Sequence, residues 1–286
     1  MSAPAVVAVG GGHGLAAVLR ALVDHCSSLV GVVSVADDGG SSGRLRRDLS
    51  IAAPGDMRRC LAALTPNSLV GRALEHRFEH GALAGHPAGN VLLAAMLDLE
   101  SDPVVVLDTL AEMVGARGRV LPATAVPVDL IASTERGTVK GQVAVSEIGS
   151  INAIRHSPAD PDVPAAVVDE IVRADAIVLG PGSLYSSVLA PVVPGVAEAF
   201  GRRSGKLVYV ANLADEPGET EGYDLAAHID AVRRHGVDPD VVLCDVAATI
   251  PAGETARVTA CELTGSVPGV HDPQRLGAAL LRVIAG

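Results

Sequence analysis

Aromatic residues are scarce in this sequence, which has no Trp, three Tyr and two Phe among 286 residues. A core must therefore be built mainly from Val, Leu, Ile and Ala, within an overall hydrophobic fraction of 49%. Aliphatic residues of this kind are typical of parallel strands that helices bury on both faces. The composition predicts an α/β fold, and it excludes a disordered or fibrous chain.

Positive charge is also in short supply. Lys and Arg together number 22 against 33 Asp and Glu, the formal net charge is −11, and the only lysines are Lys140 and Lys206. Nucleic acid and anionic membrane surfaces are bound through clustered positive charge, so we expect neither as a partner. The arginines that do cluster, between Arg44 and Arg59, suit a small phosphorylated ligand or form an ordinary solvated helix face.

Paired cysteine motifs and long apolar runs are missing as well. The four cysteines are far apart and form no C-x-x-C motif, which predicts neither a zinc site nor a disulfide framework. No apolar stretch reaches the roughly 18 residues that span a membrane. The first strand-like segment follows no basic signal-peptide region. These features predict a cytoplasmic protein with no membrane partner.

Glycine-rich loops follow three predicted strands. The apolar run 6–9 ends in a glycine loop at residues 10–14, and a helical pattern comes next. A second strand, 29–35, leads into a loop of acidic, serine and glycine residues at 36–43, and a third, 176–179, leads into a loop at 180–183. Because the carboxyl ends of parallel strands share one edge of a sheet, the three loops predict one crevice.

This order of elements predicts a Rossmann-like, mostly parallel sheet with helices on both faces. We expect a helical insertion at about 54–116, in which Asp56 is a candidate N-cap, and a small β excursion at about 120–154 with a strand at 139–145. Regular alternation returns with a helix at 164–173, and no repeat or linker interrupts the chain. Residues 1–286 are therefore predicted to be a single nucleotide-binding domain.

The loops hold residue types that suit a nucleotide diphosphate. Glycine N–H groups at a helix start bind phosphate, hydroxyls and an arginine add hydrogen bonds and positive charge, and asparagines contact a base or sugar. Structural turns and caps explain the same residues without a ligand. The predicted ligand-binding residues are Gly11, Gly12, His13, Gly14, Asp38, Gly39, Gly40, Ser41, Ser42, Gly43, Arg44, Asn90, Gly182, Ser183 and Asn212.

Other chemistries compete for these loops. Asp37 and Asp38 are candidates for binding ribose hydroxyls or a hydrated Mg²⁺, and in a transferase they become the catalytic and metal-binding residues. The segment 12–17 matches the G-x-G-x-x-G/A pattern that favours NAD, but no acid/base pair beyond His13 supports hydride transfer. A hydrolase elbow at 39–43 is disfavoured because the preceding carboxylates would oppose an oxyanion. Outside the transferase hypothesis we predict no catalytic residue, no metal and no required cofactor.

Motifs in order along most of the chain resemble those of a known family. They are Gly10-Gly11-Gly12-x-Gly14-Leu15, Val35 to Arg46, Pro54-Gly55-Asp56, Gly85-His86 with Gly89-Asn90, Arg119 to Thr124, Gly180 to Tyr185, and Gly218 to Tyr223. This set is similar to the YvcK-like gluconeogenesis factors, relatives of the CofD 2-phospho-lactate transferases. The sequence departs from that family at His13, where Thr is usual, and in a shorter segment at 189–194.

The resemblance implies a Rossmann-like cytoplasmic protein that binds UDP-sugars, notably UDP-N-acetylglucosamine, and supports cell-wall precursor supply and cell shape. It implies glutamine-dependent glucosamine-6-phosphate synthase as a partner, and we also expect a homo-oligomer. CofD relatives imply instead a Mg²⁺-dependent transfer of a phospholactyl group from a guanosine diphosphate ester, with Asp37 and Asp38 beside the metal. A UDP-sugar-binding regulator is the main hypothesis, this transferase is the alternative, and an NAD-binding protein is the third.

Overall fold

The computed structural model describes residues 3–251, 253, 257–267 and 269–286, and its largest element is a seven-stranded sheet. The strands follow the order β10-β9-β8-β7-β1-β2-β3, and every neighbouring pair is parallel. They are β1 (Ala5–Gly10), β2 (Ser28–Val33), β3 (Arg119–Pro122), β7 (Ala176–Leu179), β8 (Lys206–Val210), β9 (Val241–Asp245) and β10 (Val258–Cys261). The Rossmann-like α/β fold predicted from the sequence is confirmed.

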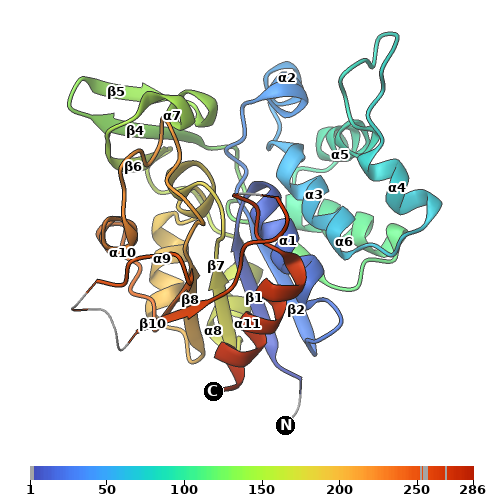
Figure 1. Cartoon of the computed structure of the whole chain (residues 1–286). Coiled ribbons are helices and arrows are strands. Elements are labelled where there is room, and N and C mark those ends of the chain that lie inside the picture. The colour runs from blue at the N-terminus through green and yellow to red at the C-terminus, as the bar shows by residue number, and fades with distance from the viewer. Residues whose placement is uncertain (1–2, 252, 254–256, 268) are drawn as a thin grey trace.

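Helices cover both faces of this sheet (Figure 1). The strand order runs in opposite directions from β1 and β7, so right-handed crossovers place the helices that follow them on opposite faces. After β1 comes α1 (Gly12–Leu22), which packs against α3 (Pro54–Leu64) and α11 (Pro273–Ala285). After β7 comes α9 (Pro194–Gly201), which packs against α8 (Ala165–Arg173). A further crossover helix, α10 (Leu225–Arg234), joins β8 to β9.

Two insertions flank the main sheet on opposite sides (Figure 1). The first, between β2 and β3, contains α3 with α2 (Gly40–Leu49), α4 (Leu69–Glu75), α5 (Ala88–Leu99) and α6 (Pro103–Val114). The second, between β3 and β7, is an antiparallel sheet of β5 (Gly137–Lys140), β4 (Asp129–Thr134) and β6 (Ile151–Ser157) with α7 (Gln142–Ile148). Since β3 pairs with β2, the β excursion begins only at β4. That residues 1–286 form one nucleotide-binding domain stays a prediction.

Two local predictions are wrong. Residues 40–43 do not belong to a loop, because Gly39 is an N-cap in extended conformation and α2 begins directly after it. The strand predicted at 139–145 ends at Lys140, where Gly141 adopts a φ of 107° and α7 starts. In both cases glycine turns the backbone from an extended to a helical path within one or two residues.

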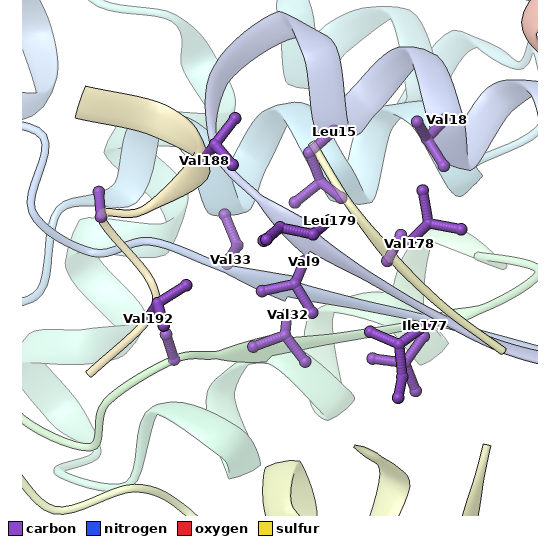
Figure 2. Close-up of a cluster of buried hydrophobic side chains, with 14 of the residues drawn as sticks. Val9, Leu15, Val18, Val32, Val33, Ile177, Val178, Leu179, Val188 and Val192 are labelled. Atoms are coloured by element: carbon purple, nitrogen blue, oxygen red, sulfur yellow. The ribbon is translucent and has the colours of Figure 1, made fainter. Parts of the chain in front are cut away.

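The core around the central strands is aliphatic, as the composition predicts. Figure 2 shows Val9 of β1 and Leu179 of β7 packed with Leu15 of α1 and with Val188, all of them fully buried. Burying one such side chain stabilises a fold by about 1.5–3 kcal/mol. This packing fixes the carboxyl ends of β1 and β7, from which two of the glycine loops emerge. Among the helices of the described residues, none has the length and apolar character that a membrane crossing requires.

Candidate functional site

A pocket lies where the strand order reverses, between β1 and β7. Open parallel sheets bind ligands at such a point, outside the carboxyl ends of the strands. The pocket has a volume of about 290 Å³, and its walls come from the loops after β1, β7 and β8 and from the segment before α11. The predicted residues that line it are Gly11, Gly12, His13, Gly14, Gly182, Ser183 and Asn212. The structure brings these residues together, and ligand binding by them stays a prediction.

Glycine is required in this wall because two backbones approach closely. A Cβ atom on Gly14 would lie 2.0 Å from the carbonyl oxygen of Pro181, and one on Gly11 would lie 2.9 Å from an oxygen of Asp56. Gly12 has a φ of +61°, in the left-handed region. These glycines allow the first turn of α1 to sit against the loop after β7. The N–H groups of that turn carry partial positive charge, which favours an anion.

A carboxylate already occupies part of this helix start. Asp56 accepts a hydrogen bond of 2.8 Å from the N–H of Gly12 and forms an ion pair with Arg59. It does not cap α3, so that prediction is wrong: Ala53 is the N-cap, and Pro54 takes the first helical position, where its fixed φ suits a helix start. Asp56 therefore links the start of α3 to the glycine loop.

Two arginines of α3 bring positive charge near the glycine loop. Burial lowers the pKa of His13, and the guanidinium groups of Arg59 and Arg58 lower it further. The imidazole of His13 is therefore neutral at pH 7. Arg59 keeps about a quarter of its side chain exposed, although it is paired with Asp56. An anion bound at the first turn of α1 would lie within the field of these arginines.

Asn90, Ser41 and Arg44 lie in a separate hydrogen-bond network and do not line the pocket. Ser41 Oγ bonds to His86 Nδ1 at 2.8 Å, and the amide of Asn90 donates to Ser41 Oγ and accepts from Arg58 Nε, both at 3.1 Å. Asn90 is only 2% exposed. Arg44 reaches His86 Nε2 at 3.3 Å. These bonds link α2, α3 and α5, and ligand binding by Asn90, Ser41 and Arg44 stays a prediction.

The other predicted residues of this segment lie at the start of α2 or directly before it. Ser42 Oγ accepts from the N–H of Gly55 at 2.9 Å, and a Cβ on Gly43 would lie 1.8 Å from the carbonyl oxygen of Asp38. Gly40 has a φ of +47° with open space around it, and the N–H of Gly39 bonds to Asp37. These contacts give all four residues a structural role, and ligand binding by Gly39, Gly40, Ser42 and Gly43 stays a prediction.

Asp37 and Asp38 turn towards different elements. Asp37 Oδ1 accepts from Gly39 N–H, and Asp38 Oδ1 accepts from the N–H of Val143 at the start of α7, both at 2.9 Å. Burial raises the pKa of Asp37, and the neighbouring carboxylate that raises it further is Asp56. Within the described part of the chain, no three His, Cys, Asp or Glu residues are grouped as metal ligands. The two carboxylates thus bond to different elements, and metal binding by Asp37 and Asp38 stays a prediction.

The sequence analysis missed residues that shape the opposite wall. Glu216 accepts from the amide of Asn212 at 2.9 Å and lines the pocket beside it. Glu219 is buried, and its carboxylate accepts from the N–H groups of Tyr185 at 2.6 Å and Ser186 at 3.3 Å, at the start of the π-helix η1 (Leu184–Val188). The motif at 218–223 was a signal for Glu219. Glu216 lies outside it, and no local pattern marks that residue.

His271 is a further lining residue that the sequence did not suggest. It lies in the irregular segment between β10 and α11, and only 8% of it is exposed. No glycine motif or strand end marks this position in the sequence. It reaches the pocket because α11 packs against α1.

Comparisons with known proteins place the chain in a family. Residues 6–286 match the model of the 2-phospho-L-lactate transferase CofD family. A relative from Mycobacterium tuberculosis (strain ATCC 25618 / H37Rv) is 41% identical over 98% of this chain and 90% of its own. The gluconeogenesis factor of Bacillus subtilis (strain 168) is 40% identical over 81% of this chain and 75% of its own.

A solved structure agrees with this placement. The crystal structure of a UPF0052 family member from Bacillus halodurans superimposes with a TM-score of 0.92 at 33% identity, covering 98% of this chain and 99% of that one. The family match, the relatives and the shared fold confirm the resemblance that the sequence motifs indicated. The chain belongs to the CofD family, and its relatives there include proteins named gluconeogenesis factors.

Proposed function

We propose that this protein is a regulator that binds a UDP-sugar, UDP-N-acetylglucosamine in particular, and acts in cell-wall precursor supply and cell shape. The observation that carries the proposal is the pocket between β1 and β7, where a helix start faces polar side chains on the opposite wall. The name gluconeogenesis factor, given to relatives about 40% identical, supports a role in carbon metabolism.

The two walls suit the two parts of such a ligand. The first turn of α1, with Arg59 nearby, favours the negative charge of a diphosphate. Asn212 donates one amide hydrogen to Glu216 and accepts one hydrogen bond from the N–H of Leu213. An amide has two hydrogens and two lone pairs, so Asn212 retains one of each for a base or sugar. Ser183 adds a hydroxyl to the same wall.

Regulation requires that the ligand favour one conformation or assembly over another. We propose a homo-oligomer in the cytoplasm that signals to glutamine-dependent glucosamine-6-phosphate synthase, with no cofactor required for binding. Pull-down of that enzyme by the purified protein, with and without the UDP-sugar, tests the partner separately from the ligand.

Calorimetric titration of the protein with UDP-N-acetylglucosamine, GDP and NAD, each with and without Mg²⁺, tests the ligand. We expect UDP-N-acetylglucosamine to bind most tightly and to remain unchanged. Asn212→Ala should weaken that binding about twofold to tenfold, the loss of about one hydrogen bond. Asn152→Ala, which changes an exposed asparagine of β6, is the matched control and should bind as the wild type does. Tighter binding of GDP or NAD would contradict the proposal.

A CofD-like transferase is the second candidate, favoured by the family match and by the repulsion between Asp37 and Asp56. A divalent cation bound beside them would neutralise charge and stabilise a diphosphate leaving group. Asp56 is already paired with Arg59, which makes it a weaker ligand for such an ion. Formation of product from a guanosine diphosphate ester only with Mg²⁺, and its loss in Asp37→Asn, would establish this activity instead.

A further inference from the structure

His271 lines the pocket, and one of its ring nitrogens is buried without a protein partner. The residue is 8% exposed and lines the same cavity as Ser183 and Asn212. Its Nε2 atom has no hydrogen-bond partner among the residues that the structure describes. Buried polar atoms in native proteins are nearly all paired, and each exception calls for an explanation such as a ligand. A molecule bound in the pocket would supply the missing partner of Nε2.

The backbone of Ala211 acts on the same ring. It raises the pKa of His271, which favours a proton on the ring nitrogen that faces it. Because Nε2 is unpartnered, we assign this proton to Nδ1. Burial lowers the pKa of His271 and outweighs the opposite effects of Ala211 and Asp245, so the ring is neutral at pH 7. In a neutral ring with its proton on Nδ1, Nε2 carries a lone pair and can only accept.

Hydrogen bonds hold the backbone around His271 in place. His271 and Thr264 form an antiparallel bridge, and the N–H of Asp272 bonds to the carbonyl of Leu263 at 2.8 Å. Asp272 then caps α11, which lies beside α1 in Figure 1. A residue on a backbone held in this way loses little conformational entropy when a ligand binds. A preorganised acceptor of this kind favours specific binding.

A hydrogen-bond acceptor at this position restricts which part of the ligand can lie beside it. The lone pair on a neutral ring accepts a hydrogen bond from an N–H or O–H group and cannot bond to a phosphate oxygen, which is itself an acceptor. Glu216, on the same wall, also disfavours negative charge there. The phosphates therefore belong at the first turn of α1, and the uncharged part of the ligand belongs beside His271.

We propose that Nε2 of His271 accepts a hydrogen bond from the uncharged part of the nucleotide sugar, an N–H of the base or a hydroxyl of a sugar, and thereby determines specificity. This inference rests on the proposed function. It assigns a recognition role to the segment before α11, which lies apart from the glycine motifs in the sequence.

The test compares two substitutions that differ in one respect. In His271→Asn the amide nitrogen can replace Nδ1 at Ala211, and the acceptor at Nε2 is lost. In His271→Gln the longer side chain places an amide oxygen near the former Nε2, so the acceptor is kept. We expect His271→Asn to weaken UDP-N-acetylglucosamine binding about tenfold, and His271→Gln to restore most of the affinity. His228→Asn, at a buried histidine of α10 outside the pocket, should bind as the wild type does.

Titration with UDP as a second probe locates the donor. Equal losses for UDP and UDP-N-acetylglucosamine in His271→Asn place it on the base or ribose, and a loss confined to the latter places it on the N-acetylglucosamine. Wild-type affinity in His271→Asn, or equal losses in the Asn and Gln variants, would overturn the inference and leave the proposed function standing. If the wild type binds GDP or NAD instead, the proposed function fails, and the same variants tested with that nucleotide decide the role of His271. If none of these nucleotides binds, both fail.

Discussion

Replacement of Gly14 by alanine is expected to push apart two walls of the pocket. The new Cβ would lie 2.0 Å from the carbonyl oxygen of Pro181 and 2.7 Å from its carbon. Both atoms are backbone, so no side-chain rotation relieves the contact. Because Cβ atoms essentially never lie within 3.0 Å of a heavy atom outside their own stretch of chain, α1 and the loop after β7 must separate by about 1 Å.

The energetic cost follows from two opposing effects. Overpacking in a well-packed region costs typically about 1–3 kcal/mol, and a clash between two backbones belongs at the upper end of that range. Alanine within a helix gains about 1 kcal/mol over glycine. We therefore expect Gly14→Ala to lower the free energy of unfolding by about 2 kcal/mol, which corresponds to a fall in Tm of about 3 °C for a chain of 286 residues.

Urea unfolding and calorimetric titration with UDP-N-acetylglucosamine measure the two consequences. The displaced wall should weaken ligand binding by at least about tenfold, because hydrogen bonds weaken steeply when their geometry is lost. Gly201→Ala is the matched control: it also adds a methyl group to a helix, α9, at a glycine with no heavy atom within 4 Å of the added Cβ, and should leave binding unchanged. A Gly14→Ala protein with wild-type stability and affinity would refute the close approach described here.

Three further substitutions test the surrounding scaffold. Asp245→Asn should cost about 1–2 kcal/mol at pH 7. Burial alone would raise the pKa of Asp245, but four hydrogen bonds to its carboxylate lower it overall. The charged carboxylate therefore stabilises the fold above about pH 4, and this stabilisation is lost as the pH falls further. The stability of Asp245→Asn should lack this dependence on pH. Glu219→Ala should cost about 2 kcal/mol, whereas Glu219→Gln, which keeps an acceptor for Tyr185, should cost less than 1 kcal/mol in urea unfolding. Arg46→Lys should destabilise by about 1–2 kcal/mol in the same assay, because one ammonium cannot replace a guanidinium that bonds to Asp129 and two carbonyls. Unchanged stability in any of these would contradict its assigned role.

The sequence predicts the central strands and the loops after them because their signals are local. The apolar run 6–9 and the glycines that follow it mark a strand, a turn and a helix within a few residues of one another. The pocket follows from these loops by a general property of parallel sheets, which explains why Gly14, Ser183 and Asn212 meet.

Other parts of the site depend on contacts that no local pattern reveals. Asn90 follows a glycine in a motif that suits a ligand, yet packing of α5 against α2 and α3 gives its amide to Ser41 and Arg58. Asp56 looks like a helix cap, and its partner is Gly12, far away in the sequence. His271 enters the pocket only because the last helix returns to the first. Tertiary packing determines all three.

The central position of β1 has a consequence for how the chain is made. Its neighbours are β2, which follows directly, and β7, whose Ala176 stands opposite Val6. During synthesis from the N-terminus, β1 therefore has an unpaired edge until residues 176–179 have emerged. An apolar strand with free backbone N–H and C=O groups is a site for association with other chains. Ribosome-bound fragments that stop before β7 should aggregate more readily than those that include it.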